Sequence, residues 1–157
     1  MAEFIKVTEQ SSLYDNLEQM SVTDLLTNLN NEDQKVALAV RESIPVMAAL
    51  VEKIVERMEK GGRVFYIGAG TSGRLGVLDA SELPPTYGVS PDLVIGLIAG
   101  GDKALRSAVE SAEDDAHKAW NELKEFDANE LDTLIGIAAS GTTPYVIGGL
   151  RDARENG

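Results

Sequence analysis

The chain has 157 residues, close to the length of one domain, and its 43% hydrophobic and 25% charged residues are a balance typical of globular proteins. Aspartate and glutamate outnumber lysine and arginine by 26 to 14, which gives a formal net charge of −12. This charge, with no basic cluster along the chain, disfavours nucleic acid and anionic membrane surfaces as partners. The chain has no cysteine, which excludes disulfides, thiolate zinc sites and cysteine nucleophiles within it.

The sequence pattern changes twice along the chain, which divides it into three regions. Residues 1–20 are predicted to be a polar lead-in, 21–60 an N-terminal helical region, and 61–157 the first part of an α/β domain. The first residues, MAEFIKVTEQSS, are polar, and no stretch approaches the ~20 apolar residues that a membrane-spanning helix needs. We therefore expect a cytoplasmic protein with no membrane partner.

The helical region is expected to contain separate helices. Ser21 or Thr23 is a candidate cap for a short helix through LLTNLN, which NEDQKVALAVRE follows as a second helical pattern. Pro45 lies inside the next apolar pattern, where a proline in a helix interior costs about 3 kcal/mol. We therefore expect a new helix there, with Ser43 as its cap and Gly61 after its end.

From Arg63 onward, strand and helix patterns alternate. Strands are expected in VFYI, LVIGLIAGG and TLIGIAAS, and helices in VLDASEL (ending before Pro84), in 103–126 and in YVIGGLRDAREN. This alternation predicts a parallel sheet flanked by helices on both faces. Three strands are few for such a sheet, and Gly157 resembles a helix C-cap, so we expect the chain to be part of a longer protein.

Two loops rich in glycine and hydroxyl groups follow the first and third predicted strands. In open parallel sheets, ligands bind beyond the carboxyl ends of the strands, and helix N-termini at that edge favour an anion. The loops therefore predict a phosphate site, the alternatives being ordinary tight turns or a dinucleotide site, for which the expected acidic residue after the second strand is missing. The candidate phosphate-binding residues are Gly68, Gly70, Thr71, Ser72, Gly73, Arg74, Ser140, Gly141, Thr142 and Thr143.

Carboxylates near these loops are candidate acid–base groups. Glu82 ends the helix after the first loop, where an acid opposes the helix dipole, although a solvated surface glutamate is the commoner explanation for such a residue. Glu110, Glu113 and His117 are spaced so that they share a face of the predicted helix at 103–126. A charged outer face is the simpler interpretation of these three, and no metal site is expected because no fourth ligand is evident.

Several blocks, in order, resemble those of the N-acetylmuramic acid 6-phosphate etherases. These blocks are FYIGAGTSGRLGVLDASELPPTYGVSP, LIAGG, AVESAEDDA and GIAASGTTPYVIGGL, and NNEDQKVALAVRESIP is similar to that family's N-terminal helical region. The resemblance runs from about Met20 to Gly157 and implies a sugar isomerase (SIS) domain, a five-stranded parallel sheet flanked by helices. On this basis residues 61–157 are the first, incomplete part of a SIS-type α/β domain, and the chain is about the N-terminal half of a family member.

The resemblance implies cleavage of the D-lactyl ether of N-acetylmuramic acid 6-phosphate to N-acetylglucosamine 6-phosphate and D-lactate, by elimination and water addition. Glu113 matches the family's base at C2, and Glu82 matches the acid that protonates departing lactate and then activates water. The two loops match its sugar-phosphate-binding segments, and no metal or organic cofactor is implied. Ser111 replaces a glycine common in the family, and Thr142 replaces a common arginine.

The sequence leaves two other functions as alternatives to this enzyme. One is a non-catalytic sugar-phosphate-binding regulatory module, like the glucokinase regulatory proteins, and the other is a structural fragment that pairs with another half or a second copy. The presence of both Glu82 and Glu113 favours the enzyme. The resemblance also implies a homodimer whose partner residues complete the site. We expect the 157-residue chain alone to show weak activity or none.

Overall fold

The computed structural model describes residues 8 and 10–156. The predicted lead-in at 1–20 falls partly on residues outside this range, and the predicted helix C-cap at Gly157 lies outside it altogether. By its internal contacts the chain divides into two compact units, Met1–Lys53 and Ile54–Gly157. The second unit holds the sheet and the candidate site.

The helical region begins with a short 3-10 turn at Leu17–Gln19, followed by the helix α1, Val22–Met58. The hydroxyl of Ser21 accepts a 3.1 Å hydrogen bond from the amide of Asp24, which confirms Ser21 as a helix cap. Before the turn, the hydroxyl of Tyr14 donates a 2.7 Å hydrogen bond to the carboxylate of Glu32. The segment before α1 is therefore attached to the side of that helix.

The prediction of a new helix at Pro45 is wrong, because α1 continues through this residue. Proline removes one amide donor, and with it the hydrogen bond to the carbonyl of Arg41. Both Arg41 and Pro45 are exposed, so water can satisfy that carbonyl. The cost is local, and the turns on either side keep their hydrogen bonds. None of the described helices, α1 included, is both long and apolar enough to cross a membrane.

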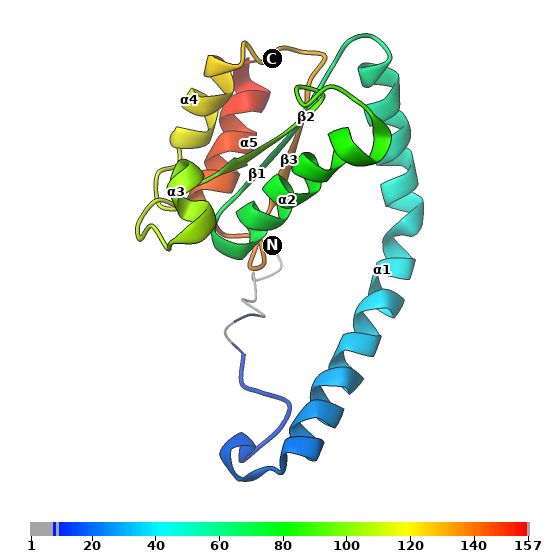
Figure 1. The fold of residues 1–157 in the computed structure, drawn as a ribbon, viewed down its shortest axis with the longest axis vertical. Helices are drawn as coiled ribbons and strands as arrows, with labels where there is room; N and C mark the ends of the chain where they lie inside the picture. The colour runs from blue at the N-terminus through cyan, green and yellow to red at the C-terminus, as the bar shows by residue number, and fades with distance from the viewer. Residues whose placement is uncertain (1–7, 9, 157) are drawn as a thin grey trace, which may run out of the picture. The chain divides into compact units, whose positions relative to one another are not determined.

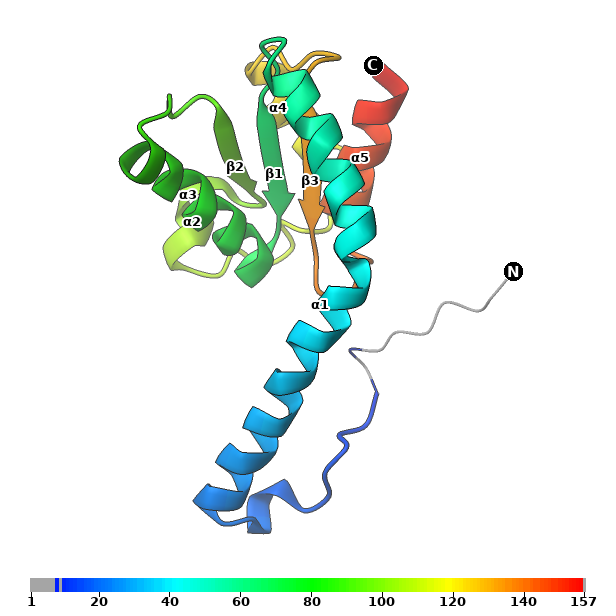
Figure 2. The ribbon, with the colours of Figure 1, turned by 90° about the vertical axis from the view of Figure 1, so that its right-hand side faces the viewer.

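The sheet has three parallel strands, β1 (Val64–Gly68), β2 (Val94–Ile98) and β3 (Thr133–Ile137), in the order β2-β1-β3. All three arrows point the same way in Figure 2, with β1 in the centre. Gly68, the last residue of β1, lies opposite both Ile98 and Ile137, the last residues of its neighbours. The three strands therefore end together, and the parallel sheet predicted from the sequence is confirmed.

Helices cover both faces of this sheet, as predicted. α2 (Gly70–Tyr87) packs on β1 and β2, whereas α5 (Pro144–Asn156) packs on β3 and β1 and is itself covered by α4 (Lys118–Glu125). Figure 1 views the sheet on edge, with α2 on one side and α4 and α5 on the other. The short helix α3 (Gly101–Arg106) packs against β2.

The core lies between the central strand and α5. Its buried cluster consists of Ile67, Ala99, Ala119, Tyr145 and Val146. Gly149 on α5 makes this packing close, because an added Cβ would come within 2.7 Å of both Ala119 and Ile67. The burial of β1 on both faces explains why its sequence, VFYIG, is a continuous apolar run rather than an alternating one.

The prediction that the first helix ends before Pro84 is also wrong, since α2 runs through Pro84 and Pro85 to Tyr87. The φ angle fixed by a proline ring is compatible with a helix, and what the two prolines remove is amide donors. The amide of Gly88, which has a φ of 67°, closes the last turn by donating a 2.9 Å hydrogen bond to the carbonyl of Pro84.

The predicted helix at 103–126 is wrong for a different reason. α3 ends at Arg106 and α4 begins at Lys118, and an irregular segment, residues 107–117, joins them. Ser111 in this segment has a φ of 60°, which no right-handed helix allows. The carbonyl of Glu113 accepts its hydrogen bond from the amide of Tyr145 on α5 instead of from its own segment. A tertiary contact has thus replaced the helical hydrogen-bond pattern.

Candidate active site at the carboxyl ends of the strands

The turn from β1 into α2 contains three glycines, which have two different structural roles. A Cβ at Gly68 would lie 2.7 Å from the amide nitrogen of Gly73, and one at Gly73 would lie 2.6 Å from Cγ1 of Ile98. These two glycines therefore let the start of α2 lie directly on the strands. Gly70 has a φ of 54°, a left-handed conformation that glycine adopts without strain. The first amides of α2, which have no acceptor within the helix, consequently face the edge where the strands end.

A cavity of about 170 Å³ lies beside this loop. It brings the loop together with the segment 107–117, which follows β2 and α3 in the chain. Its lining residues are Ala69, Gly70, Arg74, Ala99, Ala104, Ala108, Val109, Glu110, Ser111, Ala112 and Glu113. Arg74 donates a 3.0 Å hydrogen bond from Nε to the carbonyl of Leu105, which fixes this cation beside the cavity. The predicted loop, its cation and Glu113 therefore surround one hollow.

The second predicted loop, 139–143, lies at the same edge because β3 pairs with β1 along its length. The hydroxyls of Ser140 and Thr142 lie 2.8 Å apart, and Ser140 Oγ also accepts a 3.3 Å hydrogen bond from the amide of Thr142. These residues are not among those that line the 170 Å³ cavity. Gly141 has a φ of 68°, so the loop turns where glycine is required.

The first amides of α5 are less available than the sequence suggested. The amide of Tyr145 donates to the carbonyl of Glu113 at 2.9 Å, and that of Val146 donates to the carbonyl of Thr143 at 3.1 Å. Pro144 has no amide hydrogen at all. The second loop therefore offers its side-chain hydroxyls to a ligand, whereas the first loop offers backbone amides.

Glu82 does not lie at this cavity. It is an exposed residue of α2, separated from Gly70 by roughly three helical turns, or about 18 Å of helix. α2 starts at the carboxyl ends of the strands and runs back along the sheet. Glu82 therefore lies near the C-terminal end of α2, away from the cavity. Within one chain the structure therefore does not bring the two predicted catalytic glutamates together.

Among the cavity residues that were not predicted as part of the site, two have polar side chains, namely Glu110 and Ser111. The sequence placed Glu110 only on a helix face shared with Glu113 and His117. Residues 107–117 are not helical, so these residues do not share a helix face. The described residues contain no group of three or more His, Asp or Glu side chains arranged to hold a metal ion. The available signal was the glycine that the resemblance implies at the position of Ser111, because glycine is suited to the left-handed backbone found there.

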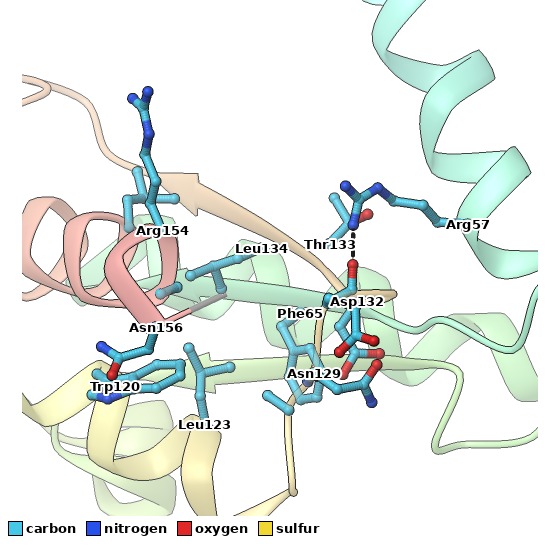
Figure 3. Close-up of a pocket in the computed structure, with 14 residues that line it drawn as sticks. Arg57, Phe65, Trp120, Leu123, Asn129, Asp132, Thr133, Leu134, Arg154 and Asn156 are labelled. Carbon is cyan, nitrogen blue, oxygen red and sulfur yellow. Dashed lines mark hydrogen bonds between the residues drawn. The ribbon is translucent and has the colours of Figure 1, made fainter.

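A larger hollow, of about 640 Å³, lies at the opposite, amino ends of the strands, among β3, α4 and α5 (Figure 3). Arg57 there donates to the carbonyl of Glu130, and the side chain of Arg154 extends away from the other labelled residues. Asp132 is engaged by Arg63, whose terminal nitrogen lies 2.7 Å from the carboxylate. Because ligands of open parallel sheets bind beyond the carboxyl ends of the strands, this hollow at the amino ends is not the candidate active site.

Comparison with known families agrees with this geometry. Residues 46–154 match the family described as the glucokinase regulatory protein N-terminal SIS domain. The chain belongs to this SIS family. The predicted SIS-type fold is thereby confirmed, and the three parallel strands with helices on both faces form part of it.

Curated relatives of this SIS chain carry the name N-acetylmuramic acid 6-phosphate etherase. The relative from Bacteroides fragilis (strain YCH46) is 64% identical over 154 residues, which cover 98% of this chain and 55% of the relative. The one from Christiangramia forsetii is 64% identical over 150 residues, or 96% of this chain and 55% of the relative. The one from Caldanaerobacter subterraneus is 56% identical over 141 residues, or 90% and 46%. The chain thus spans about half the length of the relatives it matches.

Proposed function

We propose that the protein containing this chain is a lyase that cleaves the D-lactyl ether of N-acetylmuramic acid 6-phosphate, releasing D-lactate and N-acetylglucosamine 6-phosphate. The observation that carries the proposal is the gathering of the glycine loop, Arg74 and Glu113 around one cavity, in a chain 64% identical to proteins named for this reaction. The alternative, a sugar-phosphate-binding regulatory module, requires the loops but neither glutamate.

The substrate's phosphate is assigned to the two loops. The amides at the start of α2 and the hydroxyls of Thr71 and Ser72 supply donors, and Arg74 supplies a full positive charge. Ser140 and Thr143 add hydroxyls from the loop after β3. A protein with a net charge of −12 repels a doubly charged ligand at long range, so short-range amide and hydroxyl hydrogen bonds must provide most of the attraction.

The reaction is assigned to two carboxyl groups. In the open-chain sugar the aldehyde acidifies the proton at C2, and the carboxylate of Glu113 accepts that proton as the bond between C3 and the lactyl oxygen breaks. The carboxyl of Glu82 gives its proton to the departing lactate, and its carboxylate then takes a proton from the water that adds at C3. The proton held by Glu113 returns to C2. The sequence of steps uses no metal or organic cofactor.

The separation of Glu82 from the cavity supports a homodimer as part of the proposal, with each active site taking Glu82 from a second copy. The first unit of the chain has an apolar face suited to such an interface. Within α1, large hydrophobic side chains recur every three or four residues and are 47–76% exposed, and they are Val36, Val40, Ile44, Val46, Met47, Leu50 and Val51. A stripe of this kind on a monomer is covered by another surface in a stable protein.

Muramic acid is a component of peptidoglycan, and its phosphate ester is an intracellular sugar. We therefore include in the proposal a cytoplasmic role in peptidoglycan recycling and amino sugar catabolism. This assignment rests on the chemistry of the proposed substrate, and its support is the shared name of the relatives.

The test is lactate release from N-acetylmuramic acid 6-phosphate by the full-length gene product. We expect release with the wild type and none with Glu82→Gln, while the matched control Glu125→Gln, an exposed change on α4, leaves the rate unchanged. Binding of the sugar phosphate without lactate release would establish the regulatory alternative. Residues 1–157 alone are expected to release lactate slowly or not at all, because they span about half the length of the relatives and form only three strands of the sheet.

A further inference from the structure

Asp152 on α5 is a buried charged residue, with 7% of its surface exposed. The chemistry proposed above does not use it. Burying a carboxylate is costly unless hydrogen bonds replace those it makes with water. The hydrogen-bond partners of Asp152 therefore indicate its structural role.

Each oxygen of Asp152 has a partner. Oδ2 lies 2.7 Å from Nδ1 of His117, and Oδ1 accepts hydrogen bonds from Nε and a terminal nitrogen of Arg151 at 3.0 and 2.8 Å. The hydrogen bond from His117, and secondarily that from Arg151, lowers the pKa of the Asp152 carboxyl. An ionised carboxylate can only accept, so Nδ1 of His117 is the donor.

His117 is the last residue of the segment 107–117, which carries Glu110, Ser111 and Glu113 into the cavity. Its side chain is 71% exposed, so packing does not hold it in place and the hydrogen bond to Asp152 does. That bond joins the end of an irregular segment to a helix of the core.

Two further contacts fasten the same segment to α5. The carbonyl of Glu113 accepts the amide hydrogen of Tyr145, and the carbonyl of Ala116 lies so close to Gly148 that a Cβ there would overlap it. Tyr145, Gly148 and Asp152 are spaced i, i+3 and i+7, which places them along one face of α5. The segment is therefore attached to one stripe of α5, and His117–Asp152 is the only side-chain bond among these three contacts.

We propose that His117 and Asp152 are positioning residues, whose hydrogen bond holds the segment 107–117 on α5 and thereby places the carboxylate of Glu113 against the proton it removes. The inference rests on the proposed function in naming Glu113 as the base. Neither His117 nor Asp152 lines the cavity.

Kinetics of the full-length gene product test the positioning role. His117→Leu removes the donor and lets Glu113 move, and a displacement of about 1 Å lowers kcat by as much as ~100-fold. KM stays within about twofold, because the phosphate loops are unchanged. His117→Asn is the matched rescue, since its amide nitrogen can take the place of Nδ1, and we expect kcat within about threefold of wild type. With substrate deuterated at C2, the isotope effect on kcat rises in His117→Leu only.

Each kinetic outcome decides the matter. Equal losses in His117→Leu and His117→Asn, or a raised KM with an unchanged kcat, would overturn the inference. Arg151→Gln leaves the bond between His117 and Asp152 in place and serves as the control, with kcat expected within about twofold of wild type.

Hydrogen exchange separates this inference from the proposed function. If the pair holds the segment, His117→Leu speeds exchange of the Tyr145 amide, which is bonded to Glu113, at least ~10-fold, while the Ile67 amide in the central strand is unaffected. This result is readable even if the wild type releases no lactate, in which case only the proposed reaction fails. Unchanged exchange at Tyr145 shows that the pair does not hold the segment and overturns the inference.

Discussion

The backbone amide of Tyr145 donates a 2.9 Å hydrogen bond to the carbonyl of Glu113. Tyr145 lies in the first turn of α5, directly after the hydroxyl-bearing loop at 140–143. Glu113 lies in the segment that lines the cavity with Gly70 and Arg74. One hydrogen bond thus joins the proposed base to the helix that follows the second proposed phosphate loop. Substitutions on α5 should therefore alter the rate of the proposed reaction without changing a residue that contacts the substrate.

Gly148→Ala should destabilise the protein although alanine is the better helix former. In an exposed helix this change gains about 1 kcal/mol, but the new Cβ at Gly148 would overlap the carbonyl of Ala116. Because the overlap is with backbone, either α5 or the segment must shift, and we expect the free energy of unfolding to fall by about 2 kcal/mol. Urea unfolding measures this, with the exposed change Arg154→Ala on α5 as a near-neutral control. A gain in stability would show that the segment is free to move away.

Ser111→Gly should stabilise the protein. Ser111 has a φ of 60°, a left-handed conformation that costs a residue with a Cβ about 1–2 kcal/mol and glycine almost nothing. The greater freedom of glycine in the unfolded chain offsets part of this, which leaves a net gain of about 0.5–1 kcal/mol.

The matched control for Ser111→Gly is Ser107→Gly in the same segment. Ser107 has a φ of −136°, so glycine relieves no strain there and only the unfolded-state cost remains. We expect Tm to rise for Ser111→Gly and to fall for Ser107→Gly. Equal shifts in the two variants would contradict the strain at Ser111.

Asp132 should make part of the stability depend on acid pH. Burial raises the pKa of its carboxyl, but hydrogen bonds from the Arg63 side chain and from the amides of Arg63 and Asn129 outweigh burial, so the pKa lies below its usual value. The folded state therefore binds this proton less readily than the unfolded state, whose pKa is near 3.9. The stabilisation is fully present above about pH 5 and is lost as the pH falls through the lowered pKa.

Asp132→Asn tests this dependence. At pH 7 we expect it to lower the free energy of unfolding by about 2–3 kcal/mol, because Arg63 loses its partner in a side-chain pair of which Asp132 is only 6% exposed. Urea unfolding at pH 7 and pH 3 should show the gap between wild type and variant narrowing at the lower pH. Lys60→Gln, which breaks an exposed pair with Glu56, should change stability by less than about 0.5 kcal/mol. If the difference in the free energy of unfolding between wild type and variant stays constant with pH, the Asp132 carboxyl is not the source of the pH dependence.

Complementation tests whether two copies share each active site. Glu82→Gln and Glu113→Gln should each abolish lactate release by the full-length gene product. If Glu82 acts in a partner's site, half of the dimers in a 1:1 co-expressed mixture combine both variants, and each has one intact site of two. The mixture should then recover about a quarter of the wild-type rate. Mixing the two purified variants without subunit exchange is the control, and no recovery on co-expression would place both glutamates in one chain's site.

Much of this fold could be predicted from local sequence. The apolar runs VFYIG and TLIGI specify strands that are covered by helices, and the glycine loop specifies where the first of those helices starts. Ser21 caps α1 as its residue type predicts. Helix ends were harder to predict, because Pro45 and Pro84 both lie within helices. The φ angle of proline is compatible with a helix, and each proline removes only one amide donor.

By itself, the sequence determined the parallel α/β architecture, the loops rich in hydrogen-bond donors and the presence of two candidate glutamates. Each of these can be recognised from residues that are close together in the chain. Only the tertiary structure decided where those glutamates lie. The segment 107–117 reads as helix, yet its carbonyl at Glu113 is bonded to Tyr145 and its end to Asp152, residues more than thirty positions away. Those contacts bring Glu113 to the cavity, while the length of α2 keeps Glu82 away from it.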